Sequence, residues 1–313
     1  MSHHSGDVTI VLPIYNGLPY LHEAIASVLA QTRHDWRLLL IDDASTDGSA
    51  EAIDALNDPR IAVRRHTKNV GLYATLAEAV AQVDTEFVSI LMQDDRLHPE
   101  YLSVVGSLAS RFTAADGFWI CEDTIDSEGR VIGRGRSSGR IEPIRPGVRP
   151  WRRALLKGCI WTISGSYTRR SLLAEVPFRL DLPHCGDYHW FLRASRTRAF
   201  VYYQRPLIDL RQHEGQASTR HLRQGRNMAE MCAVMEEQLD QHPADLPVWR
   251  LCHVAGWRAW QCARLLAGNL LRGHAGSLWP LTRTTFKFLR LPPRVVIRRW
   301  LAWRPDLAAA DEV

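Results

Sequence analysis

The sequence predicts an α/β protein in which helices flank a mostly parallel β-sheet, with a helical, basic appendage at the C-terminal end. In the first hundred residues, short apolar segments alternate with segments of helical periodicity. The apolar segments are almost continuous, as strands buried on both faces of a parallel sheet are. Beyond residue 246, arginine and tryptophan recur at helical spacing. A chain of 313 residues is long enough for one such α/β domain and an appendage.

Four strands and three helices are expected in order along the first hundred residues. The expected strands are Val8–Leu12, Trp36–Ile41, Ile61–Arg65 and Phe87–Met92. The expected helices run from Tyr20 to Gln31, from a cap at Thr46 or Asp47 to about Leu56, and from Leu72 to Val83.

Polar residues follow each expected strand, and this pattern is the strongest physical indication of a site. They are Tyr15-Asn16, Asp42-Asp43, Asn69 and Asp94-Asp95. Ligands of parallel sheets bind beyond the carboxyl ends of the strands, so these four loops should converge. The first turn has neither a GxGxxG nor a GxxxxGK[ST] pattern, so a nucleotide diphosphate must be held in another way. A divalent cation bound by carboxylates would hold it.

Each acidic pair also has a purely structural interpretation. Asp94-Asp95 could be a solvated strand end, and Asp42-Asp43 could form the turn before a helix. Two adjacent carboxylates repel one another, and a bound cation relieves that repulsion. An Asp at a strand tip can also accept the ring N–H of a pyrimidine base. The pairs alone leave these interpretations open.

The sequence resembles glycosyltransferase family 2 over roughly residues 7–220. The segments that carry the resemblance are VTIVLPIYNG (8–17), LLLIDDASTDGS (38–49), NVGLYATLAEAV (69–80), FVSILMQDDRLHPEYL (87–102), GSYTRRSLLAEVPF (165–178), CGDYHWFLR (185–193) and LRQHEGQAS (210–218). The resemblance implies a GT-A type, Rossmann-like catalytic domain over residues 1–220. Its nucleotide-binding half would cover about 7–105 and its acceptor-binding half about 106–220. Residues 221–313 would form a helical, basic, Trp-rich region.

The resemblance also implies roles for the strand-end residues. Pro13 and Tyr15 match residues that line the base, and Asp43 matches the carboxylate that bonds the uracil ring, with Asp42 beside it. Asn16, Asn69 and Asp94 complete the expected nucleotide-binding set. Asp95 matches the acid that ligates Mn²⁺ or Mg²⁺. Met92 stands where family members often have the first Asp of a D-x-D-D pattern, so one carboxylate fewer faces the metal.

Asp187 matches the Asp of the family's "ED" motif, which implies the catalytic base. Gly186 replaces the Glu of that motif. An inverting transfer needs one base to take the proton of the acceptor hydroxyl, while the metal neutralises the departing diphosphate. Two structural alternatives remain for this segment. Asp187 could cap a helix over Tyr188–Ser195, or the cluster from His184 to His189 could belong to a zinc site.

Four further positions are expected near the acceptor or the diphosphate. Arg211 and His213 match the family's R-x-H segment, and the histidine could ligate the metal, bond a phosphate or be an ordinary loop residue. Trp161 and Ser166 are expected to line the acceptor pocket, because aromatic rings stack on sugars. A buried core tryptophan is the alternative for Trp161.

Residues 246–305 contain eleven basic residues and no Asp or Glu. The net charge of the chain is +5, so the remainder (5 minus 11) carries −6. Arg-rich helices with Trp and Leu on another face bind anionic membrane surfaces, which is the partner expected here. The alternative is a helical appendage packed on the catalytic domain with solvated arginines. No recognised nucleic-acid-binding module occurs, so no nucleic-acid partner is expected.

The sequence therefore predicts an inverting, metal-dependent glycosyltransferase that uses a nucleotide-sugar donor, preferentially a UDP-sugar, and a glycan or lipid-linked acceptor. Surface polysaccharide assembly is the expected setting. Two alternatives remain, a catalytically inactive sugar-nucleotide or membrane-binding scaffold and a sugar-nucleotide nucleotidyltransferase. Scattered cysteines without a CxxC pair, a polar Met1–Asp7 segment and the lack of an 18-residue apolar stretch predict a cytoplasmic protein, peripheral on the inner face of the membrane.

Overall fold

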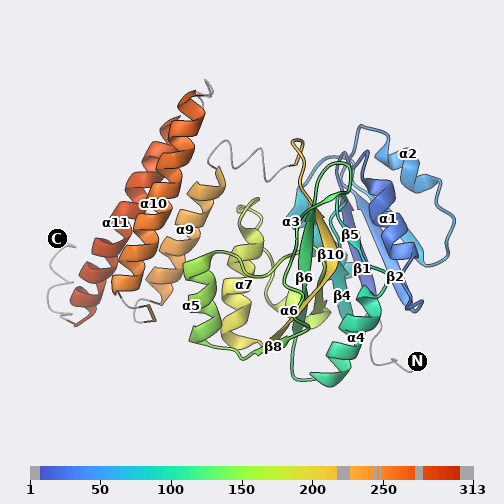
Figure 1. The fold of residues 1–313 in the computed structure, drawn as a ribbon, viewed down its shortest axis with the longest axis horizontal. Helices are drawn as coiled ribbons and strands as arrows, with labels where there is room; N and C mark the ends of the chain where they lie inside the picture. The colour runs from blue at the N-terminus through green and yellow to red at the C-terminus, as the bar shows by residue number, and fades with distance from the viewer. Residues whose placement is uncertain (1–7, 217–225, 243–244, 247, 272–277, 304–313) are drawn as a thin grey trace. The chain divides into compact units, whose positions relative to one another are not determined.

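A ten-stranded β-sheet organises the part of the chain from Val8 to Arg211 (Figure 1). The structure is a computed structural model that describes residues 8–216, 226–242, 245–246, 248–271 and 278–303. The chain divides into two units. The first comprises Met1–Trp151 and Cys159–His213, and the second comprises Arg152–Gly158 and Glu214–Val313.

The strands follow the sequence pattern closely in the first hundred residues and continue into a second half. They are β1 (Val8–Ile14), β2 (Trp36–Asp42), β3 (Ile61–Arg65), β4 (Phe87–Ile90), β5 (Arg96–Leu97), β6 (Gly117–Ile125), β7 (Val131–Gly133), β8 (Ile141–Ile144), β9 (Ser166–Arg169) and β10 (Phe200–Arg211). The helices up to β10 are α1 (Leu21–Leu29), α2 (Ser49–Asp54), α3 (Leu72–Gln82), α4 (Tyr101–Arg111), α5 (Val148–Lys157), α6 (Arg170–Glu175) and α7 (Gly186–Thr197).

The sheet confirms the predicted mostly parallel α/β architecture. Its strand order is β3-β2-β1-β4-β9-β6-β10-β5, with β7 beside β6 and β8 beside β10. The first four strands are parallel to one another, and β6 and β10 form a second parallel pair. Strand β9 is antiparallel to both of its neighbours and joins the two parallel sets. The short strand β5 pairs with the end of β10 and thereby brings the loop after β4 to that strand.

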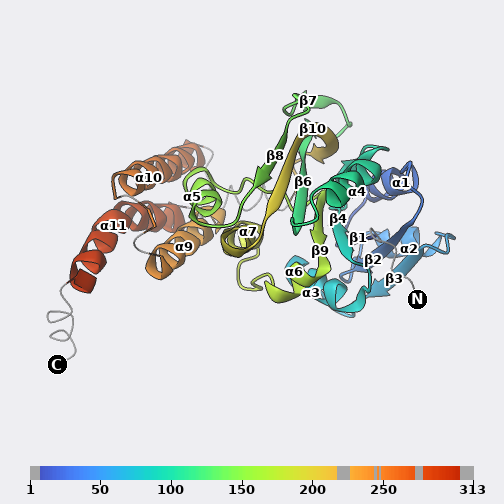
Figure 2. The ribbon, with the colours of Figure 1, turned by 90° about the horizontal axis from the view of Figure 1, so that it is seen from below.

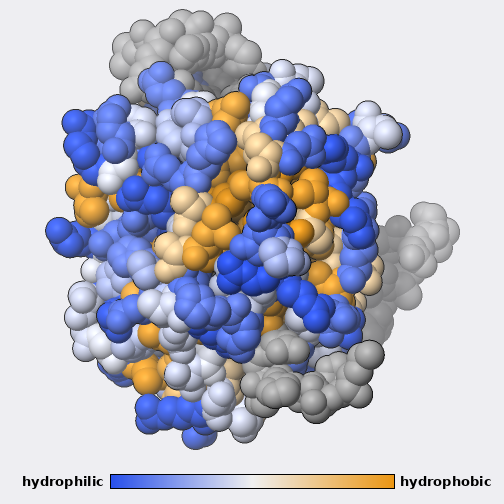
Figure 3. All heavy atoms as spheres, turned by 90° about the vertical axis from the view of Figure 1, so that its right-hand side faces the viewer, coloured by the Kyte–Doolittle hydropathy of each residue, from blue (hydrophilic) through white to orange (hydrophobic). Residues whose placement is uncertain are grey.

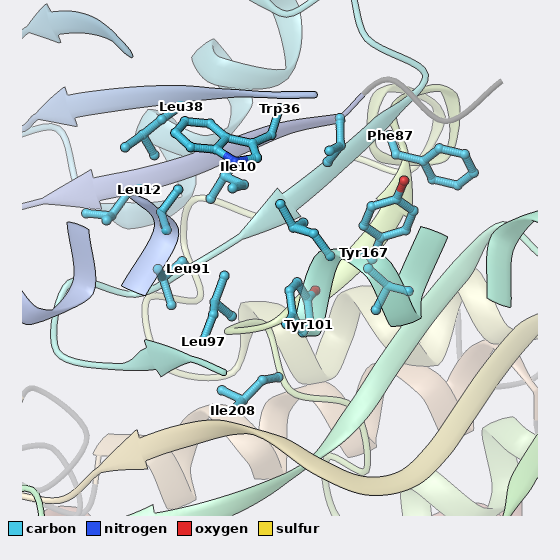
Figure 4. Close-up of a cluster of buried hydrophobic side chains, with 14 of the residues drawn as sticks. Ile10, Leu12, Trp36, Leu38, Phe87, Leu91, Leu97, Tyr101, Tyr167 and Ile208 are labelled. Carbon is cyan, nitrogen blue, oxygen red and sulfur yellow. The ribbon is translucent and has the colours of Figure 1, made fainter. Parts of the chain in front are cut away.

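Helices cover both faces of the sheet (Figure 2). Alternate residues of β1 pack into one apolar cluster with the buried sides of α1 and α4 (Figure 4). In α1 the buried positions are Leu21, Ala24, Ile25 and Val28, the spacing of one helical face. Helix α3 lies on the other face and contacts β1, β2 and α6. On the side of the unit where α1, α2 and β2 lie, apolar residues form a band between hydrophilic side chains (Figure 3).

Two predicted helix starts are wrong. Helix α2 begins after Gly48, whose φ of 94° only glycine adopts readily, so neither Thr46 nor Asp47 is its N-cap. Asp47 instead accepts hydrogen bonds from the backbone N–H groups of Ser49 and Leu18. Helix α7 begins at Gly186 with Cys185 as its N-cap, so Asp187 lies inside the first turn and is not a cap.

The described residues of the second unit include three long helices, α9 (Arg226–Gln241), α10 (Val248–Leu271) and α11 (Leu278–Trp303), and α11 contacts both of the others. Helix α11 continues through Pro292-Pro293, a pair of residues that usually interrupts a helix. Each proline removes one backbone hydrogen bond and costs about 3 kcal/mol in a helix interior. Phe288 and Leu291 are buried just before the prolines, and this packing offsets part of that cost. No helix among the described residues is long and apolar enough to span a membrane.

Candidate active site

Hydrogen bonds join the loops after β1, β2 and β4 at the carboxyl end of the sheet. The side-chain amide of Gln93 bonds both the N–H and the carbonyl of Tyr15, at 2.8 and 3.0 Å. The backbone N–H of Asn16 donates to the Ser45 hydroxyl at 2.9 Å, and Asn16 Oδ1 accepts the N–H of Thr46 at 2.8 Å. The predicted convergence of these loops is therefore confirmed.

Two residues of these loops hold a backbone conformation that L-amino acids rarely adopt. Asn16 has a φ of 52° and Ala44 a φ of 62°. Asparagine tolerates the left-handed region, but alanine is strained there by about 1–2 kcal/mol. Ala44 lies directly after Asp43, and strain of this kind concentrates at binding sites. Tyr15 is 49% exposed, so its ring is accessible for a base to contact.

Asp43 is held by three hydrogen bonds from the segment after β3. Its Oδ1 accepts the N–H of Val70 at 2.8 Å and bonds Nδ1 of His66 at 2.7 Å, and its Oδ2 accepts the N–H of Gly71 at 2.8 Å. Only one of these bonds involves Oδ2, so that oxygen retains a lone pair for a further donor. Asp42 is also buried and accepts the N–H of Ser45 through Oδ1 at 3.1 Å.

The remaining nucleotide-binding candidates differ in exposure. Pro13 lies within β1, opposite Ile41 of β2, and is buried. Asn69 is exposed at the start of the loop that binds Asp43.

Asp94 and Asp95 lie between β4 and β5. Asp95 is 4% exposed, and its Oδ1 accepts the backbone N–H of Arg211 at 2.9 Å. Burial, together with the charge of Asp94, raises the pKa of Asp95 to about 8, although Ser164 and Arg211 donate hydrogen bonds to it. Asp94 Oδ2 lies 3.2 Å from Nε2 of His213. The structure thus brings together both predicted acids and the predicted histidine.

Arg211 holds the loop that carries this acidic pair. Its guanidinium side chain is 0% exposed and forms an ion pair with Glu23 at 2.6 Å. It also donates to the backbone carbonyls of Asp94, Asp126 and Ser127, at 2.9 to 3.1 Å. Because its side chain is fully buried and donates to these carbonyls, Arg211 holds the loop of Asp94 in place and does not reach solvent to meet a diphosphate.

Asp187 is partly buried in the first turn of α7, and its Oδ1 accepts the N–H of Tyr188 at 2.7 Å. Its own N–H donates to the hydroxyl of Tyr73, in α3, at 3.0 Å. The described residues contain no group of three His, Cys, Asp or Glu side chains arranged to hold a metal ion. The segment from His184 to His189 therefore forms no zinc site from the described residues alone.

The two predicted acceptor residues lie in the core. Trp161 is 1% exposed, and its ring centroid is 4.6 Å from that of Trp190. Ser166 is fully buried in β9, between β4 and β6. Trp161 packs against other buried rings and Ser166 lies inside the sheet, so in this structure both belong to the core rather than to an acceptor pocket.

Sequence reasoning did not predict the contacts by which four residues, Gln93, His66, Tyr73 and Ser164, hold the site together. Ser164 accepts the N–H of Met92 at 3.2 Å and bonds Asp95. Gln93 had a visible signal, because it stands inside the D-x-D-D region at a position that the pattern leaves free. The other three act across 23 to 114 residues of sequence, so no local pattern reveals them.

An open pocket of about 770 Å³ lies at the opposite edge of the sheet, where β1, β2 and β3 begin. Val8, Trp36, Arg60 and Ile61 are among its lining residues. Ligands of parallel sheets bind at the carboxyl ends of the strands, so this pocket is not assigned to a donor.

Comparison with known proteins agrees with this fold. The sequence model of the family described as "Glycosyl transferase family 2" matches residues 9–176, more than half of the chain. An uncharacterized glycosyltransferase of Rickettsia bellii is 27% identical over 219 residues, which cover 67% of this chain and 30% of that protein. A second, from Rickettsia felis, is 27% identical over 215 residues, with 67% and 35% covered. The chain thus spans about a third of the length of these relatives.

Solved structures share the fold at low identity. Residues 1–349 of S. aureus TarS superpose with a TM-score of 0.66 and 17% identity, covering 92% of this chain and 82% of that one. The same TarS fragment in complex with UDP-GlcNAc gives 0.58 and 14%, covering 90% and 91%. The mannosyltransferase PcManGT from Pyrobaculum calidifontis, in complex with GDP-Man and Mn²⁺, gives 0.51 and 17%, covering 91% and 85%.

These findings agree with the architecture described above. The family match extends from β1 to the residue after α6, and so includes both acidic pairs. The GT-A neighbours share the mostly parallel sheet with flanking helices. This chain belongs to glycosyl transferase family 2.

Proposed function

We propose that this chain is an inverting glycosyltransferase that moves a sugar from a UDP-sugar to a glycan or lipid-linked acceptor in surface polysaccharide assembly. The observation that carries the proposal is the network joining the loop of Tyr15 to both acidic pairs, through Gln93 on one side and Ser45 on the other. A base, a ribose and a diphosphate could lie along these three loops in one continuous site.

The donor would be recognised first through its base. The free lone pair on Oδ2 of Asp43 can accept the ring N–H of uracil, while the exposed ring of Tyr15 contacts the base. The TarS fragment has been solved with UDP-GlcNAc, and PcManGT with GDP-Man. Both ligands are nucleoside-diphosphate sugars, which supports this class of donor.

A divalent cation, Mn²⁺ or Mg²⁺, fits the residues around Asp95. Burial beside Asp94 makes a second negative charge costly there, and a cation would remove that cost. Asp95 would bind the ion with Asp94 or His213 beside it, and phosphate oxygens of the substrate would supply further ligands, because the described side chains alone form no three-ligand site and Mg²⁺ sites commonly combine one or two carboxylates with substrate phosphates. When bound, such an ion supplies charge neutralisation for the departing diphosphate.

Asp187 would be the catalytic base. It would accept the proton of the acceptor hydroxyl as that oxygen attacks the anomeric carbon from the face opposite the nucleotide. One carboxylate suffices for this reaction, because the leaving group is a diphosphate and needs no proton from a second acid. Inversion at the anomeric carbon follows from the single displacement.

The second unit would bring the enzyme to an anionic membrane surface through residues 246–305. Trp249, Trp257 and Trp260 of α10 and Trp279 of α11 are between 46% and 74% exposed. Soluble proteins rarely expose so many large aromatic side chains without a partner. Eleven basic residues and no acidic residue accompany them, which matches the charge of acidic lipids. Tryptophan side chains favour the boundary between lipid and water.

Nucleotide binding and turnover together test this proposal. UDP, GDP and their sugar conjugates are compared by thermal shift with and without Mn²⁺, and the release of nucleotide from each donor is then measured. A Mn²⁺-dependent shift with UDP, followed by hydrolysis of a UDP-sugar, is expected. Binding without any turnover, also in the presence of membrane-derived acceptors, would indicate the inactive scaffold instead. The absence of nucleotide binding contradicts the proposed site.

A further inference from the structure

The space beside Gly186 is filled by the ring of Tyr73. A Cβ atom placed at Gly186 would lie 2.4 Å from Cε2 and 2.6 Å from Cζ of that ring. These atoms belong to a buried aromatic ring and not to a flexible side-chain end, so any larger residue at 186 must displace it. Gly186 is also the position at which the family pattern has Glu. In this chain, the space that the Cβ atom of a Glu at position 186 would enter is therefore occupied by Tyr73, a side chain of another helix.

Tyr73 cannot easily move away, because its ring stands at the end of a row of packed aromatic rings. Its centroid is 5.2 Å from that of Phe178, with an angle of 25° between the two planes. Phe178 stacks on Trp190 of α7 at 5.6 Å, and Trp190 packs on Trp161 at 4.6 Å. Buried aromatic pairs of this kind stabilise a fold beyond the effect of the area that they bury. The row therefore fixes α3 relative to α7.

The hydroxyl of Tyr73 lies at the start of α7, next to the proposed base. It accepts the backbone N–H of Asp187 at 3.0 Å, one of the N–H groups that a helix start leaves without an internal partner. Burial, and then the charge of Asp187, keeps the pKa of Tyr73 well above its ordinary value of 10. The phenol therefore stays neutral near pH 7, and its oxygen accepts the N–H of Asp187.

The start of α3 also contacts Asp43, on the side of the site that is proposed to bind the sugar donor. Gly71, two residues before Tyr73, is the N-cap of α3 and donates its N–H to Asp43. Asp43 is the proposed contact for the base of the nucleotide. One short segment, Val70 to Tyr73, therefore contacts both Asp43 and the backbone of Asp187.

We propose that Tyr73 is the positioning residue of Asp187 and takes the place of the Glu that is missing at Gly186. This inference rests on the proposed role of Asp187 as base. Tyr73 does not touch the reacting atoms; it sets the position of the carboxylate by binding the backbone of the same residue. The pair Tyr73 and Gly186 is then a unit, in which a large residue at one position requires a small residue at the other.

The test uses the full chain and the UDP-sugar that the wild type hydrolyses. Tyr73→Phe keeps the ring and removes only the acceptor for Asp187 N–H. The matched control is Tyr167→Phe, which removes a buried hydroxyl from a ring stacked on Phe87 in the sheet. Tyr73→Phe should lower kcat on the order of 10- to 100-fold, the effect of a slight misplacement of a reacting group. The Kd of the donor should remain within about twofold, since no group that touches the nucleotide has changed.

A double-mutant cycle tests the spatial part of the proposal. Gly186→Ala alone should lower kcat strongly, because the new methyl group collides with the ring. In a Tyr73→Ala background the same change should cost little. Donor Kd and thermal unfolding are measured for every variant, so that loss of folding is distinguished from loss of turnover. Additive effects of the two changes, or a Tyr73→Phe enzyme as fast as Tyr167→Phe, would overturn the proposal.

Asp187→Asn separates this inference from the proposed function. If Asp187→Asn turns over at the wild-type rate, the base lies elsewhere, and both the assignment and the inference fail. If Asp187→Asn is inactive but Tyr73→Phe is fully active, the proposed function stands and only the role of Tyr73 is wrong.

Discussion

Asp43 and His66 are joined by a hydrogen bond of 2.7 Å between Oδ1 and Nδ1. The other ring nitrogen of His66 lies 2.9 Å from Oε2 of Glu78, so the imidazole bridges two carboxylates. Its side chain is 10% exposed. Burial alone would lower the pKa of His66, but the hydrogen bonds and charges of Asp43 and Glu78 raise it above the ordinary value of 6.5. The proposed contact for the nucleotide base is thus held by a histidine that favours its charged form.

The stability that this bridge contributes should depend on pH. A histidine whose pKa is raised on folding stabilises the folded state fully at pH values below about 6.5, its pKa in the unfolded chain. This contribution is lost as the pH rises through the raised pKa of the folded state. The melting temperature of His66→Gln should therefore fall furthest below that of the wild type near pH 5.5, and the difference should shrink toward pH 8.5. Thermal unfolding without nucleotide measures this. His22→Gln, at an exposed position of α1, is the control, and a difference that stays constant with pH would contradict the ion bridge.

Asp95→Asn should remove the response of the protein to metal. The variant keeps the shape of the side chain but loses the charge that would bind the cation. We expect the Mn²⁺-dependent rise in melting temperature with UDP to disappear, and hydrolysis of the donor to fall at least about 100-fold. Asp84→Asn, an exposed residue paired with Arg37, is the matched control. Undiminished turnover in Asp95→Asn would remove this residue from the site.

Without metal, the same variant should be more stable than the wild type. Burial, together with Asp94, raises the pKa of Asp95 from 3.8 to about 8. A carboxyl whose pKa is raised on folding stabilises the folded state fully at pH values below its unfolded pKa. That contribution is lost as the pH rises from about 4 to about 8. Asn carries no charge at any pH, so its advantage should grow over this range and level off above pH 8. Melting curves in EDTA at several pH values measure the difference in melting temperature between Asp95→Asn and the wild type. A difference that becomes smaller with rising pH would contradict this explanation.

The strands and the acidic pairs could be predicted from the sequence because their signals are local. Continuous apolar segments followed by Asp-Asp identify β2, β4 and the edge of the sheet at which ligands of parallel sheets generally bind, and the structure places Asp43 and Asp95 at that edge. Helix starts were less predictable. Gly48 and Cys185 are the actual caps of α2 and α7, although Asp47 and Asp187 have the better side chains for capping.

The supporting residues could not be predicted, because their roles arise only from tertiary contacts. In the sequence, Tyr73 looks like one more apolar position of a helix. In the structure, its hydroxyl accepts the N–H of Asp187, 114 residues further along the chain. Arg211 occupies a segment that resembles a diphosphate contact, but the surrounding carbonyl groups bind its guanidinium. Trp161 and Ser166 are residue types found in sugar pockets, and only their burial shows that they pack in the core.

Arg211→Met should destabilise the first unit. The substitution leaves the carbonyls of Asp94, Asp126 and Ser127 without their donor, and each lost bond of this kind costs about 1–3 kcal/mol. We expect a loss of about 3 kcal/mol or more in the free energy of unfolding, measured by urea denaturation. Arg130→Met is the control. Its side chain is 72% exposed and pairs with Asp126, and exposed ion pairs contribute about 1 kcal/mol at most. Equal losses in the two variants would show that Arg211 does not support the acidic loop.

Replacing the stacked pair Trp257 and Trp260 by alanine should weaken binding to anionic membranes. Their ring centroids lie 4.8 Å apart, and Arg264 lies over Trp260 at 4.8 Å, so this part of α10 presents aromatic surface and positive charge together. Sedimentation with vesicles of phosphatidylcholine, with and without phosphatidylglycerol, measures the affinity. The wild type should bind the acidic vesicles more tightly and lose that preference at high salt, because screening weakens the attraction between arginine and acidic lipid.

For the double variant we expect an affinity loss of about tenfold per tryptophan, the effect of leaving one partly inserted aromatic ring in water. The control is Leu180→Ala, which removes a side chain that is 63% exposed in the first unit. It should bind vesicles like the wild type. Gel filtration without vesicles tests the alternative that a second copy of the chain binds this surface. A dimer that both tryptophan substitutions abolish, together with vesicle binding that they leave unchanged, would assign the surface to self-association and contradict the membrane role.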